Sequence, residues 1–141
     1  MIPDGILDTS TLILAERLSP DDLPAYPTIT AVTLAELTAG TLAATDPAEK
    51  ATRLARLERA VAGFEPLVFG TVAARAYGAV ADSMRRAGRK PTARAFDALI
   101  AATAIANNLP LYTCNPSDFQ AIDGLIVIAI AHPDQASIQA R

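Results

Sequence analysis

The sequence has one cysteine and no long apolar run. The single thiol, Cys114, has no partner for an internal disulfide and cannot build a cysteine-cluster metal site, which argues against redox chemistry. The longest apolar run, Leu125–Ala131, is far shorter than the ~20 residues that a membrane span needs. The first residues, Met1–Gly5, are not the basic leader of a secretory signal. We therefore expect a cytosolic protein without a membrane segment.

Positive charge is also in short supply. The 12 Lys and Arg face 15 Asp and Glu, a formal charge of −3, which on its face argues against a nucleic-acid partner. If four acids were held at one metal site, 12 bases would face 15 − 4 = 11 acids, a balance of +1. A run of bases is more often a solvated face than a binding site, but one such run lies directly before Asp97. Its members are Arg85, Arg86, Arg89, Lys90 and Arg94.

The length and the pattern of apolar segments predict one α/β domain over residues 1–141. About half of the residues are apolar, enough to bury a sizeable core. Strands alternating with helices predict a parallel sheet with right-handed crossovers and helices on both faces. Short strands are expected at residues 6–7, 28–30, 66–69, 111–113 and 125–131.

Two helix starts can be read from capping signals. Thr33 and Glu36 have the spacing of a capping box, which predicts a helix that opens there and ends near Gly40. Asp46 followed by proline predicts an N-cap and a second helix. One face of that second helix carries three bases that we expect to be solvent or partner surface rather than a substrate groove: Arg53, Arg56 and Arg59.

Asp97 is the anomaly of an otherwise apolar helix that is expected to run from Pro91 to about Asn107. On a helix it shares a face with Ile100, Ala101 and Ala104, the spacing of a core-facing stripe. A carboxylate there costs several kcal/mol to desolvate without a partner. It should therefore pair with a cation, accept strong hydrogen bonds or bind a metal.

Three further acids are expected at the same edge of the sheet as Asp97. Asp8 and Asp118 directly follow strands, and Glu36 lies in an early helical turn, so all of them map to the carboxyl ends of the strands. Each has a plainer role open to it: Asp8 as a helix cap, Glu36 in its capping box, and Asp118 in an Asx turn. Converging carboxylates repel unless a cation lies between them, and oxygen-only ligands suit Mg²⁺ or Mn²⁺ rather than Zn²⁺. Such a site suits phosphodiester hydrolysis.

Four segments in chain order resemble the successive signatures of PIN-domain ribonucleases, over nearly the whole chain. The length and the two C-terminal signatures are similar to those of VapC toxins of bacterial and archaeal toxin–antitoxin pairs. The segments are Leu7-Asp8-Thr9-Ser10, Glu36 within Thr33–Leu37, the helix Asp97–Ala104, and Leu111–Phe119 with its Asn115-Pro116-Ser117-Asp118 turn.

The resemblance implies an α/β/α sandwich with a five-stranded parallel sheet and a Mg²⁺- or Mn²⁺-dependent endoribonuclease. It also implies a homodimer and inhibition by a VapB-type antitoxin that lays a peptide across the active-site groove. Asp8, Glu36 and Asp97 match the three core acids of the family. Asp118 matches the fourth, although relatives sometimes fill that corner from the position of Asn115.

The resulting hypothesis assigns each group a role in RNA cleavage. Asp8 and Asp97 hold the principal metal, and Glu36 and Asp118 complete it or orient the attacking water. The hydroxyls of Thr9 and Thr113 support these acids. The basic run ending at Arg94 holds substrate phosphates.

Two other interpretations remain open. A catalytically silent PIN-like domain would only bind a protein or a nucleic acid, but such a domain would be expected to have lost a core acid, and this chain keeps all of them. An aspartyl-phosphate phosphohydrolase would use Asp8 as its nucleophile at the end of the first strand. Against it, no second acid lies two residues after Asp8.

Overall fold

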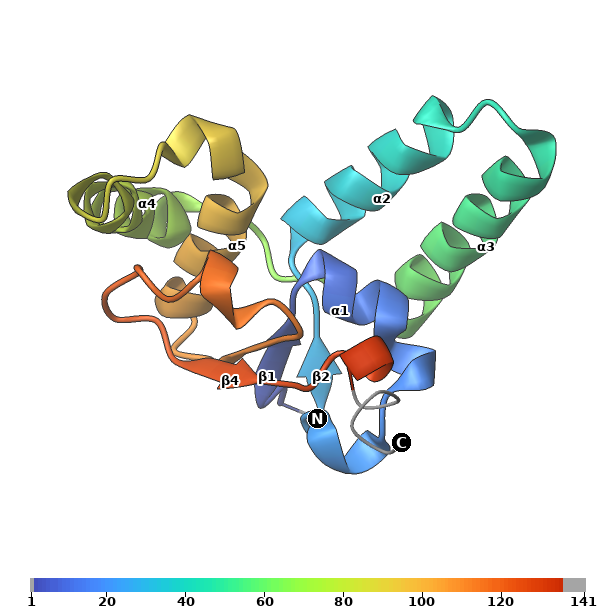
Figure 1. The fold of residues 1–141 in the computed structure, drawn as a ribbon, viewed down its shortest axis with the longest axis horizontal. Helices are drawn as coiled ribbons and strands as arrows, with labels where there is room; N and C mark the ends of the chain where they lie inside the picture. Colours follow the sequence, from blue (N-terminus) through green and yellow to red (C-terminus); the bar gives the residue numbers. More distant parts are fainter. Residues whose placement is uncertain (1, 136–141) are drawn as a thin grey trace.

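The computed structural model describes residues 2–135, which form a parallel α/β fold (Figure 1). Its strands pair in the order β2-β1-β3-β4, all parallel. The strands are β1 (Gly5–Leu7), β2 (Pro27–Thr28), β3 (Leu111–Thr113) and β4 (Val127–Ala129). The helices are α1 (Thr9–Leu14), α2 (Ala31–Ala43), α3 (Pro47–Gly63), α4 (Thr71–Arg86) and α5 (Ala95–Ala106), with short 3-10 turns at Ala15–Arg17, Pro20–Asp22, Pro91–Arg94 and Pro116–Asp118.

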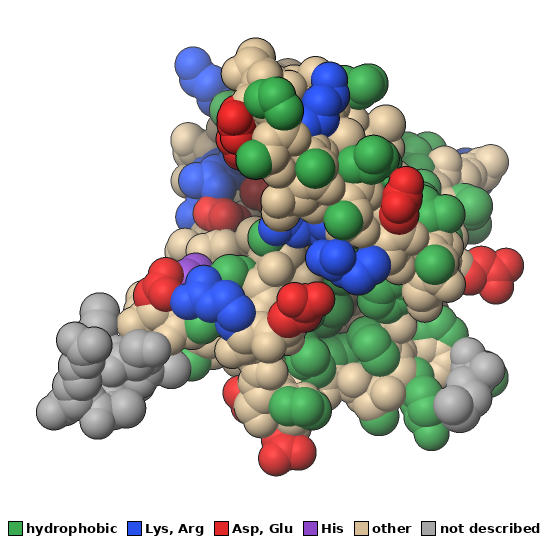
Figure 2. Space-filling view, turned by 90° about the vertical axis from the view of Figure 1, so that its right-hand side faces the viewer, with side chains coloured by type: hydrophobic (Ala, Val, Ile, Leu, Met, Phe, Trp, Pro, Cys, Tyr) green, Lys and Arg blue, Asp and Glu red, His purple; other side chains and the backbone are tan. Residues whose placement is uncertain are grey.

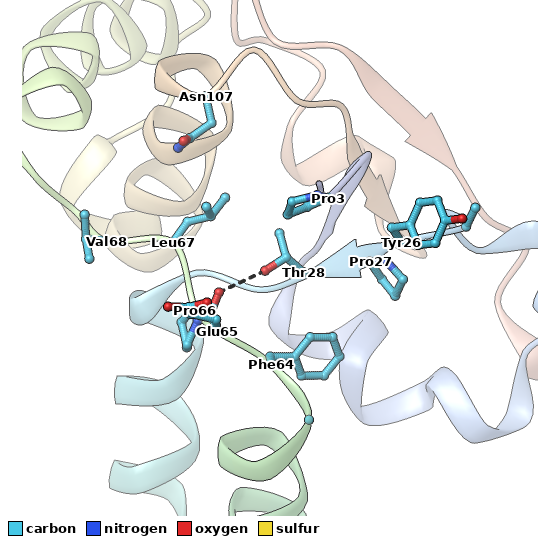
Figure 3. A pocket seen from close by; sticks show the side chains of 12 residues that line it. Pro3, Tyr26, Pro27, Thr28, Phe64, Glu65, Pro66, Leu67, Val68 and Asn107 are labelled. Atoms are coloured by element: carbon cyan, nitrogen blue, oxygen red, sulfur yellow. Dashed lines mark hydrogen bonds between the residues drawn. The ribbon is translucent and has the colours of Figure 1, made fainter. Parts of the chain in front are cut away.

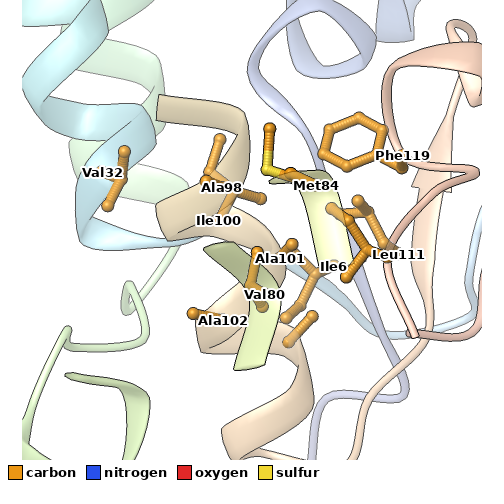
Figure 4. Close-up of a cluster of buried hydrophobic side chains, with 12 residues drawn as sticks. Ile6, Val32, Val80, Met84, Ala98, Ile100, Ala101, Ala102, Leu111 and Phe119 are labelled. Carbon is orange, nitrogen blue, oxygen red and sulfur yellow. The ribbon is translucent and has the colours of Figure 1, made fainter. Parts of the chain in front are cut away.

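The sheet separates two apolar cores, because successive side chains of a strand point to opposite faces. Ile6 of β1 packs with α4 and α5, where Met84 and Ile100 are fully buried (Figure 4). Its neighbour Leu7 packs on the other side with Ala60 of α3. Helices therefore cover both faces of the sheet, as predicted. None of the helices in residues 2–135 is long and apolar enough to cross a bilayer.

The predicted fifth strand at residues 66–69 is wrong, because the described residues form a four-stranded sheet. Leu67 does lie beside the β2 edge, where it makes one parallel bridge to Thr30. Its N–H donates to Ile29 O at 2.9 Å and its carbonyl accepts from Ala31 N at 2.8 Å. The bridge does not extend into a strand: Pro66 has no N–H to donate, and α4 begins at Thr71.

Helix α2 begins earlier and ends later than the capping signals predicted. Its N-cap is Thr30, whose hydroxyl accepts from the Thr33 N–H at 3.2 Å, so Thr33 is already inside the helix. Gly40 does not end the helix either; its carbonyl accepts a hydrogen bond from Arg53 Nη1 at 2.7 Å. The predicted cap of α3 is confirmed, since Asp46 accepts from the Glu49 N–H at 3.0 Å.

The helix that carries Asp97 is preceded by a 3-10 turn, so Asp97 lies in the first turn of α5 rather than in its second. Carboxylates are favoured in first turns by the partial positive charge of the helix N-terminus. The first turns of α1, α2 and α5 gather above the carboxyl ends of the strands (Figure 1). The fold thereby directs the predicted acids to one edge of the sheet.

Candidate active site

Asp8 follows β1 and is fixed on both carboxylate oxygens. Its Oδ1 accepts from the Thr11 N–H at 3.1 Å, so the side chain caps α1. Its Oδ2 accepts from the Thr113 hydroxyl at 2.8 Å and from the Ser10 hydroxyl at 3.5 Å. Burial raises the pKa of Asp8, and these hydrogen bonds oppose the rise. Asp8 therefore caps α1 and is also an acid of the site, two roles that the sequence analysis treated as alternatives.

Glu36 reaches the same edge from the second turn of α2. The Thr9 hydroxyl donates to its Oε1 at 2.7 Å, and the hydroxyls of Thr9 and Thr33 are 3.0 Å apart. Burial raises the pKa of Glu36, the Thr9 hydrogen bond lowers it, and the nearby charge of Asp8 raises it further. Glu36 is therefore positioned by α1 and is close enough to Asp8 to be repelled by it.

Asp97 interacts with all of the other predicted acids. Burial is the main cause that raises its pKa to about 6, from a usual 3.8. The charges of Asp118, Asp8 and Glu36 raise it further, in that order, and only Arg94 lowers it. The structure thus brings the four carboxylates within electrostatic reach of one another.

Arg94 provides the positive charge nearest to this cluster. Its Nη1 is 2.5 Å from Asp118 Oδ1 and 3.9 Å from Asp97 Oδ2. Across residues 2–135, no three Asp, Glu, His or Cys side chains are grouped closely enough to form a ready-made metal cage. The four acids nevertheless supply only oxygen donors and excess negative charge, which suits a hard divalent cation in place of the guanidinium.

Two of the carboxylates, Glu36 and Asp97, open onto solvent through a cleft of about 440 Å³ between α2 and the start of α5. Glu36 lies on one wall, and Arg94 and Asp97 lie on the other. Phe96, half of whose surface is exposed, lines the same cleft. Glu36 and Asp97 are therefore accessible to a ligand from the carboxyl edge of the sheet, whereas Asp8 is buried.

Residues 6–125 match the profile of the PIN domain. Ribonuclease VapC5 of Mycobacterium tuberculosis is 39% identical over 129 residues, which are 89% of this chain and 93% of that protein. The chain belongs to the VapC family of PIN domains. Ribonuclease VapC of Rickettsia bellii is 32% identical to this PIN domain over 133 residues, 92% of this chain and 98% of that protein.

Solved structures match this PIN domain along nearly its whole length. VapBC-5 of Mycobacterium tuberculosis, described as a member of the VapBC family of toxin–antitoxin systems, matches with a TM-score of 0.79 and 36% identity. The match covers 92% of this chain and 100% of that one. VapBC of Salmonella typhimurium, solved bound to DNA, matches with a TM-score of 0.72 and 25% identity, covering 89% of this chain and 97% of that one.

The predicted supporting residues of this PIN domain are only partly in contact with the acids. Thr9 and Thr113 touch Glu36 and Asp8 directly. Asn115 stands one step back: its Nδ2 donates to Ser10 Oγ at 3.0 Å, and its N–H donates to Thr113 Oγ1 at 2.9 Å. Sequence reasoning missed Ser10, which links Asn115 to Asp8. The signal for it was its position in the first turn after a capping Asp8.

The predicted basic run does not gather at the acids of this PIN domain. Of its members, Arg94 lines the carboxylate cleft. Arg86 points to the outer surface, where it pairs with Asp82 at 3.1 Å and Asp123 at 3.0 Å. Arg85 and Lys90 are exposed, and Arg89 is half-buried with an Nη1 that has no hydrogen-bond partner.

Another hollow lies away from the acids, beside the edge strand β2 (Figure 3). It measures about 820 Å³ and is bounded by Tyr26, by segment 63–68 and by Asn107. The Thr28 hydroxyl donates to the Glu65 carbonyl at 3.4 Å across it. With Glu65 as the sole charged residue of its lining, this hollow lacks the groups that phosphodiester chemistry needs.

Proposed function

We propose that this PIN domain is the toxin of a type II toxin–antitoxin system and a Mg²⁺- or Mn²⁺-dependent endoribonuclease. The observation that carries the proposal is the placement of Asp8, Glu36 and Asp118 around Asp97, whose pKa is raised by burial and by the charges of these three carboxylates. Such a cluster is stabilised by a cation placed among the acids. The relatives are named ribonucleases, which supports RNA as the substrate.

The residues that would hold the cation are Asp8, Glu36 and Asp97, joined by Asp118 once Arg94 has left it. When bound, a hard dication lowers the pKa of a water molecule and stabilises the oxygens of an in-line phosphoryl displacement. Thr113 and Thr9 keep Asp8 and Glu36 in fixed orientations through hydrogen bonds of 2.8 and 2.7 Å.

Arg94 can bind either a carboxylate of the site or a phosphate of the substrate. In this structure its guanidinium is bound to Asp118 and reaches toward Asp97. Displaced from them, the guanidinium remains on the wall of the cleft, where it can hold a substrate phosphate through two parallel hydrogen bonds. Arg94 would then exchange a carboxylate for a phosphate as the site is filled.

The solved relatives, VapBC-5 of a toxin–antitoxin family and a DNA-bound VapBC, support a VapB-type partner. We propose that a VapB-type antitoxin binds and inhibits this chain, that the chain forms a homodimer, and that it acts in the cytoplasm.

The structure favours the nuclease over the aspartyl-phosphate phosphohydrolase. An aspartyl-phosphate enzyme would be expected to carry a second acid two residues after Asp8, but that position is Ser10, whose hydroxyl lies 3.5 Å from Asp8 Oδ2. The catalytically silent binding module is also disfavoured, because the acids are retained and open onto a cleft.

Asp97→Asn tests the function. Induced expression of the wild type should degrade RNA and arrest growth, and the variant should lose at least about 100-fold in cleavage rate, as expected when a group that acts on the transition state is removed. Mn²⁺ binding, followed by electron paramagnetic resonance on the purified chain, should weaken in parallel. Asp123→Asn, which removes an exposed carboxylate paired with Arg86, is the matched control and should behave as the wild type. Cleavage that persists in Asp97→Asn, or in EDTA, would exclude the proposed metal-dependent mechanism.

A further inference from the structure

A second cleft lies on the other side of Glu36. It measures about 360 Å³ and runs between α1, α2 and α3. Glu36 lines both clefts and therefore lies between the Arg94 cleft and this one. Arg53 and Arg56 of α3 form its far wall, although the sequence had suggested that their face was solvent or partner surface. Figure 2 views the molecule from this side and shows Lys and Arg side chains across the middle of the face.

Arg56 differs from the two neighbouring arginines of α3. Arg53 is held by Glu49 and by the carbonyl of Gly40, and Arg59 lies 3.8 Å from Glu16. Arg56 is half-buried and has neither a hydrogen bond nor an ion pair with any residue in 2–135. A guanidinium that is partly withdrawn from water without a partner gains most from an anion that comes with a ligand.

We propose that the second cleft carries the RNA strand on the side of the cleaved bond opposite Arg94, and that Arg56 binds a backbone phosphate there. This inference rests on the proposed ribonuclease function. A polyanion that crosses four carboxylates is repelled at its middle and needs positive charge on both flanks. Arg94 supplies it in one cleft and Arg56 supplies it in the other.

The lining of the second cleft favours a nucleic acid over a protein. Glu49 and the Gly40 carbonyl already occupy Arg53, so the unpaired guanidinium of Arg56 is the donor that remains in this lining, and phosphate oxygens are the strongest acceptors for such a fork. The adjoining hollow past Arg56, about 240 Å³, is lined mainly by apolar residues such as Leu12 and Phe64, and would suit a protein side chain better. A protein segment is therefore the competing occupant that the test must separate.

The test measures RNA binding without cleavage. Each variant is made in the Asp97→Asn background and titrated against a fluorescent single-stranded RNA of about 12 nucleotides, over a range of salt concentrations. Arg56→Gln should weaken binding about 3- to 10-fold and reduce the slope of log K against log salt by about 0.7, the loss of one phosphate contact. Arg56→Lys should keep most of the slope. The matched control is Arg75→Gln, an exposed arginine of α4, which should leave both quantities unchanged.

Cleavage by chains with an intact Asp97 separates this inference from the function on which it rests. Arg56→Gln should raise KM for long RNA without changing kcat, and should leave cleavage of a dinucleotide unchanged. If the wild type cleaves RNA while Arg56→Gln binds and cleaves it equally well, the RNA path is wrong although the nuclease stands. If Arg56→Gln loses binding to polyglutamate but not to RNA, the cleft is a protein site and the inference is overturned. If the wild type cleaves no RNA, the proposed function itself fails.

Discussion

Single residues at the carboxylate edge are each tied to a group from another part of the chain. Asp8 is bonded to Thr113, and Glu36 is bonded to Thr9. Within residues 2–135, no hydroxyl donates to Asp97, and the nearest guanidinium, that of Arg94, lies 3.9 Å from Asp97 but 2.5 Å from Asp118. The charges of the other three acids converge on Asp97, where they add to burial in raising its pKa to about 6.

Burial of Asp97, together with this repulsion, predicts an unusual pH dependence for the stability of the metal-free protein. The folded-state pKa of Asp97, about 6, lies above its usual 3.8, so between these values the folded chain binds more protons than the unfolded chain. Stability should therefore fall as pH rises through this window, by about 1 kcal/mol between about pH 5 and pH 7.5 from this group. Urea unfolding in EDTA at the two pH values measures the change.

Asp97→Asn is also the control for that pH dependence. The neutral amide removes the repulsion, so the variant should be more stable than the wild type at the higher pH, and the difference should shrink at the lower one. A wild type whose stability rises through this window would contradict the assigned pKa.

At the scale of elements, the start of α2 decides where Glu36 points. The helix opens at Thr30, which is fully buried, rather than at Thr33. Thr33 is thereby free to bring its hydroxyl to Thr9, the residue that holds Glu36. A start three residues later would have moved Glu36 by nearly one turn of the helix.

Thr30→Ala should therefore destabilise the protein by about 1 kcal/mol, because it leaves the Thr33 N–H without its acceptor. Thr38→Ala, at an exposed position inside the same helix, should be neutral or slightly stabilising because alanine is the better helix former. Chemical denaturation of both variants measures the difference. A loss in Thr30→Ala that is no larger than that in Thr38→Ala would contradict the cap at Thr30.

At the scale of the whole molecule, apolar side chains remain exposed where the fifth strand was expected. Val68 and Val72 are 73% and 67% exposed, and Phe69 lies between them at the start of α4. An apolar patch of this kind on a small domain favours association with a partner surface. It adjoins the β2 edge, which the single bridge to Leu67 leaves only partly covered.

We expect this patch to form the homodimer interface. Size-exclusion chromatography with light scattering should give a dimer for the wild type and a monomer for Val72→Glu, since a charge is costly to bury in an apolar interface. Lys50→Glu is the matched control, at an exposed position of α3 on the other side of the fold, and should remain dimeric. A dimer that persists in Val72→Glu places the interface elsewhere.

Much of the candidate site could be predicted because its signals are local. Asp8 after a strand and Asp97 among apolar residues stand out in any reading of the chain, and the topology of parallel sheets places them at one edge. Thr9 and Thr113 were also anticipated as supports of the acids. The absence of a strand at residues 66–69 could not be predicted from local signals. The apolar pattern of the segment does not show whether its backbone can form a continuous series of hydrogen bonds with the β2 edge beside Pro66.

The sequence by itself determined the alternation of strands and helices, the set of four acids and the membership of the PIN domain family, because each depends on residue type and spacing along the chain. The tertiary structure alone decided which basic side chain pairs with which acid. Arg94 binds Asp118, and Arg56, in the same cleft as Glu36, has no partner within residues 2–135, since the contacts of a long side chain depend on segments that are distant in sequence.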